Sequence, residues 1–195
     1  LVRHGETSAN LEGVWHGAID TPLTPFGRLQ AARVAGHLAA TRPDVRAIYA
    51  SPLARARDTA AAIAERLRLE VALEATLREY DLGSWEGRTY RELAAVERLF
   101  ERMQADPDWR PGGGESPRQV AERYAGALER IAARHAGERV LVVGHGGAIT
   151  LALGLILDRD CATWRRVMHN CAVSELVLEP PELLAFNEVD HLREL

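Results

Sequence analysis

Short apolar segments alternate with longer helical segments along this chain, and the alternation constrains its fold more than any other feature. The apolar segments are typical of β-strands and lie at residues 1–2, 47–50, 70–73, 139–144, 172–179 and 182–188. Long segments with apolar residues at helical spacing separate most of them. Because strands that are joined by helices can run parallel, the pattern predicts an α/β sandwich around a largely parallel sheet.

Three of the expected helices begin with a hydroxyl residue followed by proline. The three pairs are Thr24-Pro25, Ser51-Pro52 and Ser116-Pro117. We expect each hydroxyl to accept hydrogen bonds from free N–H groups of the first turn, while proline suits the first helical position because it has no N–H. Gln119 completes a capping box with Ser116. Two further helices are expected, one over 90–103 and one after Gly146.

Length and composition limit the class of protein. With 195 residues, 47% of them hydrophobic, we expect residues 1–195 to form one domain, with a small lid at about 80–116. The net charge is -4 without runs of like charge, which argues against nucleic acid or an acidic membrane as partner. No apolar stretch has the length of a membrane span, and no signal peptide is visible. We therefore expect a cytoplasmic protein in which Cys161 and Cys171 are free thiols.

Basic side chains follow two of the expected strands directly. Arg3 and His4 follow the first apolar pair, and His145 follows the apolar run at 139–144. Because ligands bind beyond the carboxyl ends of strands in such sheets, we expect these groups to lie together, with Arg55 from a third strand end. Imidazoles, guanidiniums and the N–H groups of a helix amino end suit a phosphoryl group. The chain has no lysine, so arginines are its only strong cations.

A metal site is the main alternative for the two histidines, because histidine is a common metal ligand. The sequence neighbours of His4 and His145 are arginine and glycine, without a second histidine or a group of carboxylates nearby. Cationic neighbours disfavour a divalent metal, so we expect no metal and no other cofactor. A single histidine or arginine is also often only structural, and the hypothesis therefore depends on these groups acting together.

Five short motifs follow one another along the chain: "LVRHGET" with Asn10, "SPLARARDTA", "LREYDLGSWEGR", "GGGES" and "VLVVGHGGAI". Together they resemble the histidine phosphatase superfamily, in its phosphoglycerate-mutase-like branch. The resemblance implies a three-layer α/β/α sandwich, catalysis without a metal, a phosphohistidine intermediate on His4, and Glu79 as general acid. The residues that it assigns to the phosphate pocket are Arg3, Asn10, Arg55, His145 and, on a weaker match, Thr7.

Physical chemistry agrees with these roles. His4 must be uncharged to attack phosphorus, and the guanidiniums of Arg3 and Arg55 disfavour its protonation. His145, if protonated, is a further donor to the phosphate oxygens. Gly146, which has no side chain, lets the backbone approach the phosphate closely.

Glu79 must be protonated to donate to the leaving alkoxide, and it then acts as base for the incoming water. Asp81 and Glu86 lie close enough in the sequence to be alternatives. In the family, a glutamine or threonine often precedes the glycine of the segment after the first motif. His16 stands at that position here and is a candidate for contact with the substrate.

The resemblance covers both phosphatases and mutases, which differ in whether water or a substrate hydroxyl accepts the phosphoryl group. The mutases carry a long basic insertion before the "GGES" region, whereas one helix and a short loop separate Glu79 from Glu115 here. We therefore predict a phosphomonoesterase that acts on a small phosphorylated metabolite. The alternatives are a mutase-type phosphotransferase and an inactive module that binds phosphorylated ligands. The candidate substrates are sugar phosphates, phosphoglycerate derivatives, α-ribazole phosphate or a broad range of phosphate esters. The apolar strand at 172–179 is a candidate edge for a homodimer.

Overall fold

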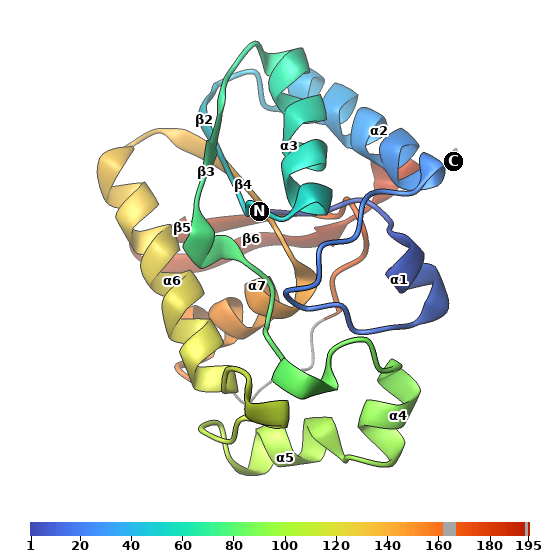
Figure 1. Ribbon diagram of the computed structural model, residues 1–195. Helices are drawn as coiled ribbons and strands as arrows, with labels where there is room; N and C mark the ends of the chain where they lie inside the picture. Colours follow the sequence, from blue (N-terminus) through green and yellow to red (C-terminus); the bar gives the residue numbers. More distant parts are fainter. Residues whose placement is uncertain (162–166, 194) are drawn as a thin grey trace.

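A computed structural model describes residues 1–161, 167–193 and 195, and its centre is one six-stranded sheet (Figure 1). The strands are β1 (Val2–Arg3), β2 (Val45–Ala50), β3 (Val71–Leu73), β4 (Arg139–Gly144), β5 (Val173–Leu178) and β6 (Pro181–Glu188). Their order across the sheet is β3-β2-β4-β1-β5-β6. The first four strands pair in parallel, while β5 and β6 are antiparallel to their neighbours. The prediction of a largely parallel sheet is confirmed.

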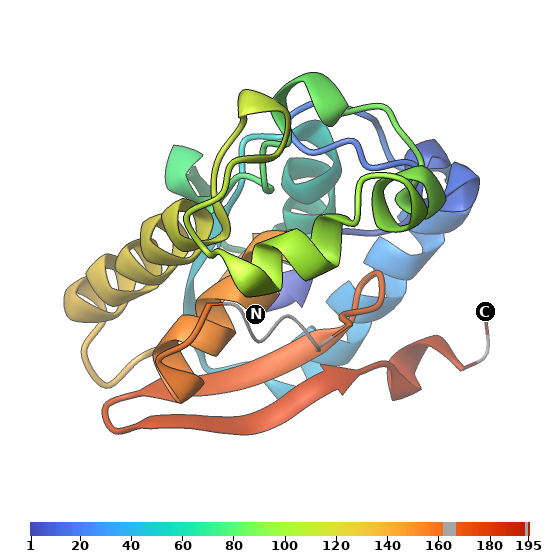
Figure 2. The same ribbon diagram turned by 90° about the horizontal axis from the view of Figure 1, so that it is seen from below.

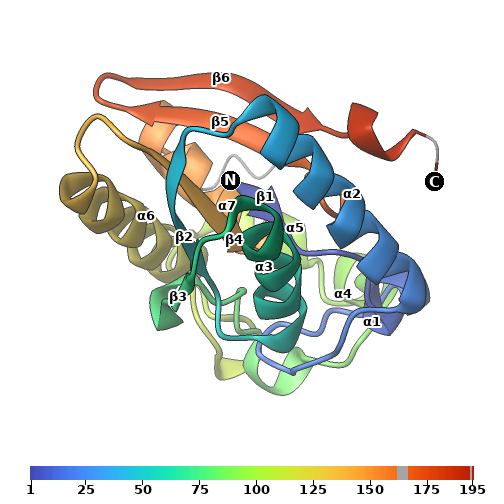
Figure 3. The ribbon, with the colours of Figure 1, turned by 90° about the horizontal axis from the view of Figure 1, so that it is seen from above.

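Helices cover both faces of the sheet, as Figure 3 shows. The covering helices are α2 (Pro25–Thr41) and α3 (Ala54–Leu67) on one face, and α6 (Pro117–Arg134) and α7 (Gly146–Leu153) on the other. Alternate residues of β4 contribute to the two cores: Leu141 and Val143 pack with α2 and α3, whereas Val142 packs with α6 and α7. A strand that is covered on both faces needs apolar residues on both, and this explains the apolar run that follows Arg139, at 140–144.

Two of the three predicted hydroxyl–proline helix starts are confirmed. Thr24 accepts a hydrogen bond of 2.9 Å from the N–H of Gly27 at the start of α2. Ser116 and Gln119 form a capping box at the start of α6. The third prediction, for Ser51, is wrong because α3 begins later and has no side-chain cap. The hydroxyl of Ser51 instead contacts a histidine in the site described below.

Ser116→Ala is expected to lower the free energy of unfolding by about 1 kcal/mol, because the amino end of α6 loses its cap. The side chain is buried, at 1% exposure, so water does not readily replace the lost hydrogen bond. Urea denaturation measures the change. Ser8→Ala, at the exposed first position of helix α1 (Ser8–Glu12), is the control and should change the free energy of unfolding by less than about 0.5 kcal/mol. Equal effects of the two substitutions would contradict the capping role.

The segment before the "GGGES" motif folds into two short helices, α4 (Tyr90–Ala95) and α5 (Leu99–Ala105), and not into the single helix predicted over 90–103. The break lies at Arg98, whose φ of 51° is left-handed and ends the helical path. Because of the turn, Leu93 and Leu99 are both fully buried in one core. Both helices form the bottom of the molecule in Figure 1 and lie nearest the viewer in Figure 2.

The remaining helical turns are α1 (Ser8–Glu12), Ala75–Leu77, Gly83–Trp85, Pro111–Gly113, Gly154–Asp158 and Asp190–Leu192.

The edges of the sheet are β3 and β6. The predicted edge for a homodimer is therefore wrong, because β5 lies between β1 and β6 and has both sides paired. Cys161 and Cys171 are buried free thiols, as expected. Within residues 1–161 and 167–193, no helix combines the length and the apolar composition needed to cross a membrane.

Candidate active site

The carboxyl ends of three parallel strands bring two of the predicted histidines together. The N–H of His4, after β1, donates to the carbonyl of Gly144 at 3.0 Å, and the N–H of Ser51, after β2, donates to the carbonyl of Val143 at 3.1 Å. These bonds bring the ends of β1 and β2 against the end of β4, which His145 follows. The ring centroids of His4 and His145 are 5.2 Å apart. The expected juxtaposition of the two imidazoles is present.

His4 is buried and uncharged. Its Nδ1 lies 2.7 Å from the carbonyl oxygen of Gly5, which can only accept, so Nδ1 carries the hydrogen and Nε2 carries a lone pair. Burial is the main reason that the pKa of His4 lies well below its usual range, and nearby His145, Arg55 and Arg3 lower it further. The tautomer and the charge state are those of a nucleophilic imidazole.

His145 is also uncharged. The sequence made it a further donor to the phosphate only if it were protonated, and that condition is not met here. Nε of Arg55, which is always a donor, lies 3.2 Å from its Nδ1, so that nitrogen is an acceptor. The hydrogen is therefore on Nε2, which donates to Oγ of Ser51 at 2.8 Å. Burial is the main reason that the pKa of His145 lies well below its usual range. Sequence analysis missed Ser51 here because its position before proline is also typical of a helix cap.

Arg55 is fully buried and acts on a neighbouring loop as well as on His145. Its two terminal nitrogens donate to the carbonyls of Ile19, at 2.9 Å, and Gly17, at 2.6 Å. Burial lowers the pKa of Arg55 to about 10, which leaves it charged at neutral pH. Both terminal nitrogens of Arg55 are thus directed at backbone carbonyls, while its positive charge stays close to His4.

His16 adds a third imidazole to the site. Its ring centroid is 6.0 Å from that of His4, and its Nδ1 hydrogen-bonds with the hydroxyl of Thr21. Burial is the main reason that the pKa of His16 is lowered to about 3, so this ring is uncharged too. Glu86 holds the loop that follows His16, because its carboxylate accepts a hydrogen bond of 2.7 Å from the N–H of Ala18.

Arg3 lies against the amino end of α7. A Cβ atom on Gly146 would be 3.2 Å from Cδ of Arg3, so the glycine permits this close packing. One terminal nitrogen of Arg3 donates to the carbonyl of Met168. Nε is buried and has no hydrogen-bond partner among the described residues. Burial lowers the pKa of Arg3, and this guanidinium keeps a donor available to an anion.

A cavity of about 400 Å³ lies in front of Arg3. Its lining side chains are polar at Arg3, Asn10, Glu79 and Asn170 and apolar at Trp15, Tyr90, Phe100, Val167 and Met168. His4 and His145 are buried, at 1% and 0% exposure, and do not line this cavity. A larger cavity of about 1110 Å³ lies against β4, β5 and α6, and none of the predicted site residues line it. The smaller cavity is therefore the candidate binding site.

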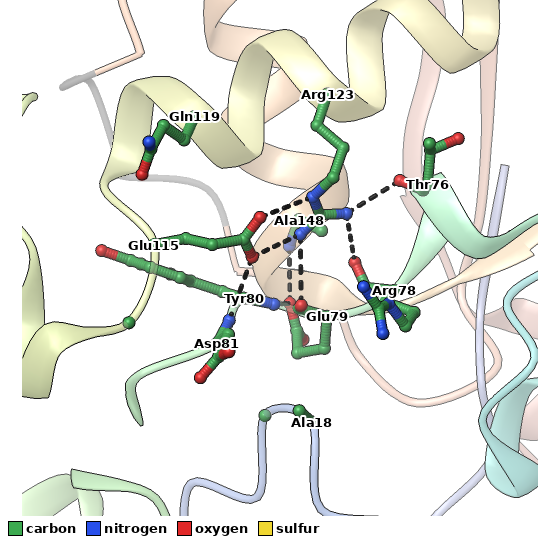
Figure 4. A network of polar contacts seen from close by, with 12 residues as sticks. Ala18, Thr76, Arg78, Glu79, Tyr80, Asp81, Glu115, Gln119, Arg123 and Ala148 are labelled. Carbon is green, nitrogen blue, oxygen red and sulfur yellow. Dashed lines mark hydrogen bonds and ion pairs between the residues drawn. The ribbon is translucent and has the colours of Figure 1, made fainter. Parts of the chain in front are cut away.

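Glu79 is the carboxylate that lines this cavity, whereas the sequence alternatives Asp81 and Glu86 do not. Its two oxygens accept bonds from the N–H groups of Gly147, at 3.1 Å, and Ala148, at 2.7 Å (Figure 4). From the sequence, these N–H groups of α7 were expected to bind a phosphate. In the structure they are directed at the side chain of Glu79.

Asn10 and Thr7 have separate roles. Thr7 is fully buried, caps α1 in a capping box with Asn10, and does not line the cavity. Asn10 does line it, and its Oδ1 accepts a bond of 3.1 Å from Nδ2 of Asn170. Asn170, which the sequence indicated only as part of the scaffold, also donates to the carbonyl of His4 at 3.0 Å and lines the cavity.

No group of three or more histidine, cysteine, aspartate or glutamate side chains is placed to hold a metal ion within residues 1–161 and 167–193. The three imidazoles near one another, at His4, His16 and His145, instead have two guanidiniums beside them. The arrangement combines a neutral imidazole nucleophile, fixed positive charge and a carboxylate at a helix amino end. These groups are suited to phosphoryl transfer.

Known proteins with similar sequences and structures agree with this chemistry. Phosphoglycerate mutase-like protein 4 of Arabidopsis thaliana is 42% identical over 154 residues, which are 76% of this chain and 66% of that protein. The metal-independent phosphoserine phosphatase of the same plant is 42% identical over 154 residues, 76% of this chain and 64% of that protein. The chain thus spans slightly less than two thirds of the length of these relatives.

A mycobacterial glucosyl-3-phosphoglycerate phosphatase, solved with VO3, has a TM-score of 0.86 to this structure and 31% sequence identity. The match covers 96% of this chain and 97% of that one. The model of the histidine phosphatase superfamily (branch 1) matches residues 1–187. The resemblance inferred from the five motifs is confirmed: the chain belongs to the histidine phosphatase superfamily, branch 1.

Proposed function

We propose that this protein is a phosphomonoesterase that hydrolyses a small phosphorylated metabolite through a phosphohistidine on His4, with Glu79 as proton donor. The observation that carries the proposal is the state of His4: an uncharged ring whose Nδ1–H is held by the carbonyl of Gly5 and whose Nε2 carries the lone pair. The similarity to two proteins named as phosphatases supports hydrolysis as the reaction.

In the first step, Nε2 of His4 attacks phosphorus in line with the ester oxygen. The bond between phosphorus and that oxygen breaks, and Glu79 gives a proton to the leaving alkoxide. Arg3, with a free buried Nε, binds the phosphoryl oxygens, and Arg55 contributes positive charge nearby. The amide of Asn10, which lines the cavity, is a further donor to these oxygens.

In the second step, water attacks the phosphohistidine. Glu79, now a carboxylate, takes a proton from the water, the bond between Nε2 and phosphorus breaks, and inorganic phosphate leaves. In this proposal His145 acts through Arg55, because its Nδ1 accepts the hydrogen bond that orients the guanidinium. His16, 6.0 Å from the nucleophilic ring, is a candidate for contact with the substrate.

The segment between the acid and the "GGGES" motif favours a phosphatase over a mutase. A mutase needs cations there to hold a second anionic group of its substrate. Arg88 is paired with Glu97 at 2.9 Å, and Arg98 is paired with Glu101. Among the described residues, Arg3 is the arginine that lines the cavity. The side chains of this segment that line the cavity, Tyr90 and Phe100, are aromatic and carry no charge that could hold a second anionic group.

We further propose that residues 1–195 form one domain and that the segment at about 80–116 is a small lid. The contribution of Tyr90 and Phe100, from α4 and α5, to the wall of the cavity supports this role. The volume of the cavity suits a small metabolite.

A cytoplasmic location and a homodimer are also proposed. The buried free thiols of Cys161 and Cys171 support a reducing compartment. A second copy would pair along β3 or β6, since these are the edges of the sheet.

Turnover of p-nitrophenyl phosphate is expected to continue unchanged in excess EDTA, because the proposed steps use only side chains. Release of inorganic phosphate and of p-nitrophenol measures it. Loss of activity that a divalent metal restores would overturn the metal-independent reaction. Isomerisation of phosphoglycerate faster than phosphate release would identify a mutase instead, and binding of phosphorylated ligands without any turnover would identify an inactive binding module.

A further inference from the structure

The loop that carries Glu79 is held through its backbone by a side chain from α6. Nη1 of Arg123 donates to the carbonyls of Thr76, at 2.8 Å, and Arg78, at 2.9 Å. Nη2 of the same guanidinium is 3.3 Å from the carbonyl of Glu79 itself. Figure 4 shows Arg123 reaching from its helix to this loop. A single guanidinium therefore fixes the backbone at and before the proposed proton donor.

Glu115 completes the arrangement from the "GGGES" motif. Its carboxylate accepts two bonds of 2.7 Å from Arg123, one from Nε and one from Nη2. Its Oε2 also accepts from the N–H of Asp81 at 3.3 Å, so the ion pair holds the loop after Glu79 as well as before it. The side chains of Arg123 and Glu115 are only 16% and 26% exposed. Two parallel hydrogen bonds between a guanidinium and a carboxylate fix the relative orientation of the two groups.

The glycines of the same motif bring Glu115 close to this loop. A Cβ atom on Gly114 would lie 2.1 Å from the carbonyl oxygen of Asp81, a distance that no side chain permits. The N–H of Glu115 donates to that carbonyl at 2.8 Å. Backbone thus packs on backbone here, and the carboxylate of Glu115 is placed against the Glu79 loop without freedom to move away.

We propose that Arg123 and Glu115 form a positioning pair that holds Glu79 at the amino end of α7, in reach of the leaving oxygen. The inference rests on the proposed function, because it assumes that Glu79 donates the proton. Arg123 and Glu115 do not line the cavity, so they act through the loop. A pair that served only stability would affect every substrate equally, whereas a positioning pair affects the step that needs the proton.

Two substrates separate these roles. p-Nitrophenolate departs without a proton, whereas an alkoxide needs one, so only the alkyl ester depends strongly on the acid. We expect Arg123→Gln to lower kcat/KM, which reports the steps up to formation of the phosphohistidine, about 100-fold for the best alkyl phosphate of a panel and less than about fivefold for p-nitrophenyl phosphate. Glu115→Gln, which keeps the guanidinium, should give the same pattern with a loss of about tenfold. It also tests the proposal if Arg123→Gln does not fold.

Two controls accompany the variants. Arg118→Gln removes an exposed arginine of the same helix, paired with Asp108 at 2.8 Å, and should leave both rates within about twofold. Glu79→Gln should show the same difference between substrates as Arg123→Gln, and the double variant should lose little more than Glu79→Gln alone, because both act on one proton transfer.

Equal losses for the two substrates in Arg123→Gln and Glu115→Gln, or additive losses in the double variant, would overturn the positioning role. If Glu79→Gln lowered the rates for both substrates equally, Glu79 would not be the proton donor and the proposed function would be wrong. This outcome differs from one in which only the variants of Arg123 and Glu115 fail to distinguish the substrates.

Discussion

Replacing His4 with alanine is expected to lower kcat for p-nitrophenyl phosphate by about 10,000-fold or more, because alanine cannot form the bond to phosphorus. In the unchanged protein, rapid quenching without acid followed by mass spectrometry should detect a phosphoryl group on the peptide that contains His4. The ring is buried and its Nδ1 is already bonded to Gly5, so Nε2 is the expected position of the phosphoryl group.

His135→Ala is a suitable control for this experiment. His135 lies at the end of α6, where its Nδ1 is 2.8 Å from the carboxylate of Glu138. Its loss should change kcat by less than about twofold. Undiminished turnover in His4→Ala, or a phosphoryl group on another side chain, would remove His4 as the nucleophile.

The second large effect is expected on stability in mild acid. Burial lowers the pKa values of His4 and His145 well below their usual range and that of His16 to about 3. Between about pH 6.5, the value for an unfolded chain, and these lowered values, the unfolded chain binds the three protons and the folded chain does not. Stability therefore falls as the pH falls below about 6.5, by up to about 4 kcal/mol per pH unit from these three groups. Above pH 6.5 they contribute no change.

Urea denaturation at a series of pH values between 7.5 and 5 measures this slope. His16→Gln should reduce it by about one third, because one of the three protons is no longer taken up on unfolding. Ser8→Ala, which removes no titratable group, is the control and should leave the slope unchanged. A free energy of unfolding that stays constant from pH 7 to pH 5 would show that the imidazoles are not held uncharged.

The sheet and the pairing of His4 with His145 were predictable because they follow from local patterns. The run at 140–144, after Arg139, is apolar, as expected of a strand covered on both faces. Two histidines directly after parallel strands must lie at the same edge once those strands are neighbours, and β1 does pair with β4. The position of Glu79 came from the motif around it, since a single glutamate has no pattern of its own.

The hydrogen-bonding states in the site were not predictable in the same way. His145 is an acceptor because Nε of Arg55 points at it, and this depends on Arg55 also reaching the carbonyls of Gly17 and Ile19. The helix break at Arg98 is also decided by packing, because nothing local in the residues forbids a continuous helix there. The hydrogen-bonding state of His145 and the helix break at Arg98 depend on contacts between segments that are distant in the sequence. The spacing of residues within one segment therefore does not predict them.

The order of the strands also bears on how the protein is made. β1 is a two-residue strand near the middle of the sheet, and its parallel partner β4 begins only at Arg139. During synthesis the nucleophile therefore leaves the ribosome long before the strand that supports it, and such distant pairings form slowly. A nascent chain therefore brings His4 and His145 together only when translation is well advanced.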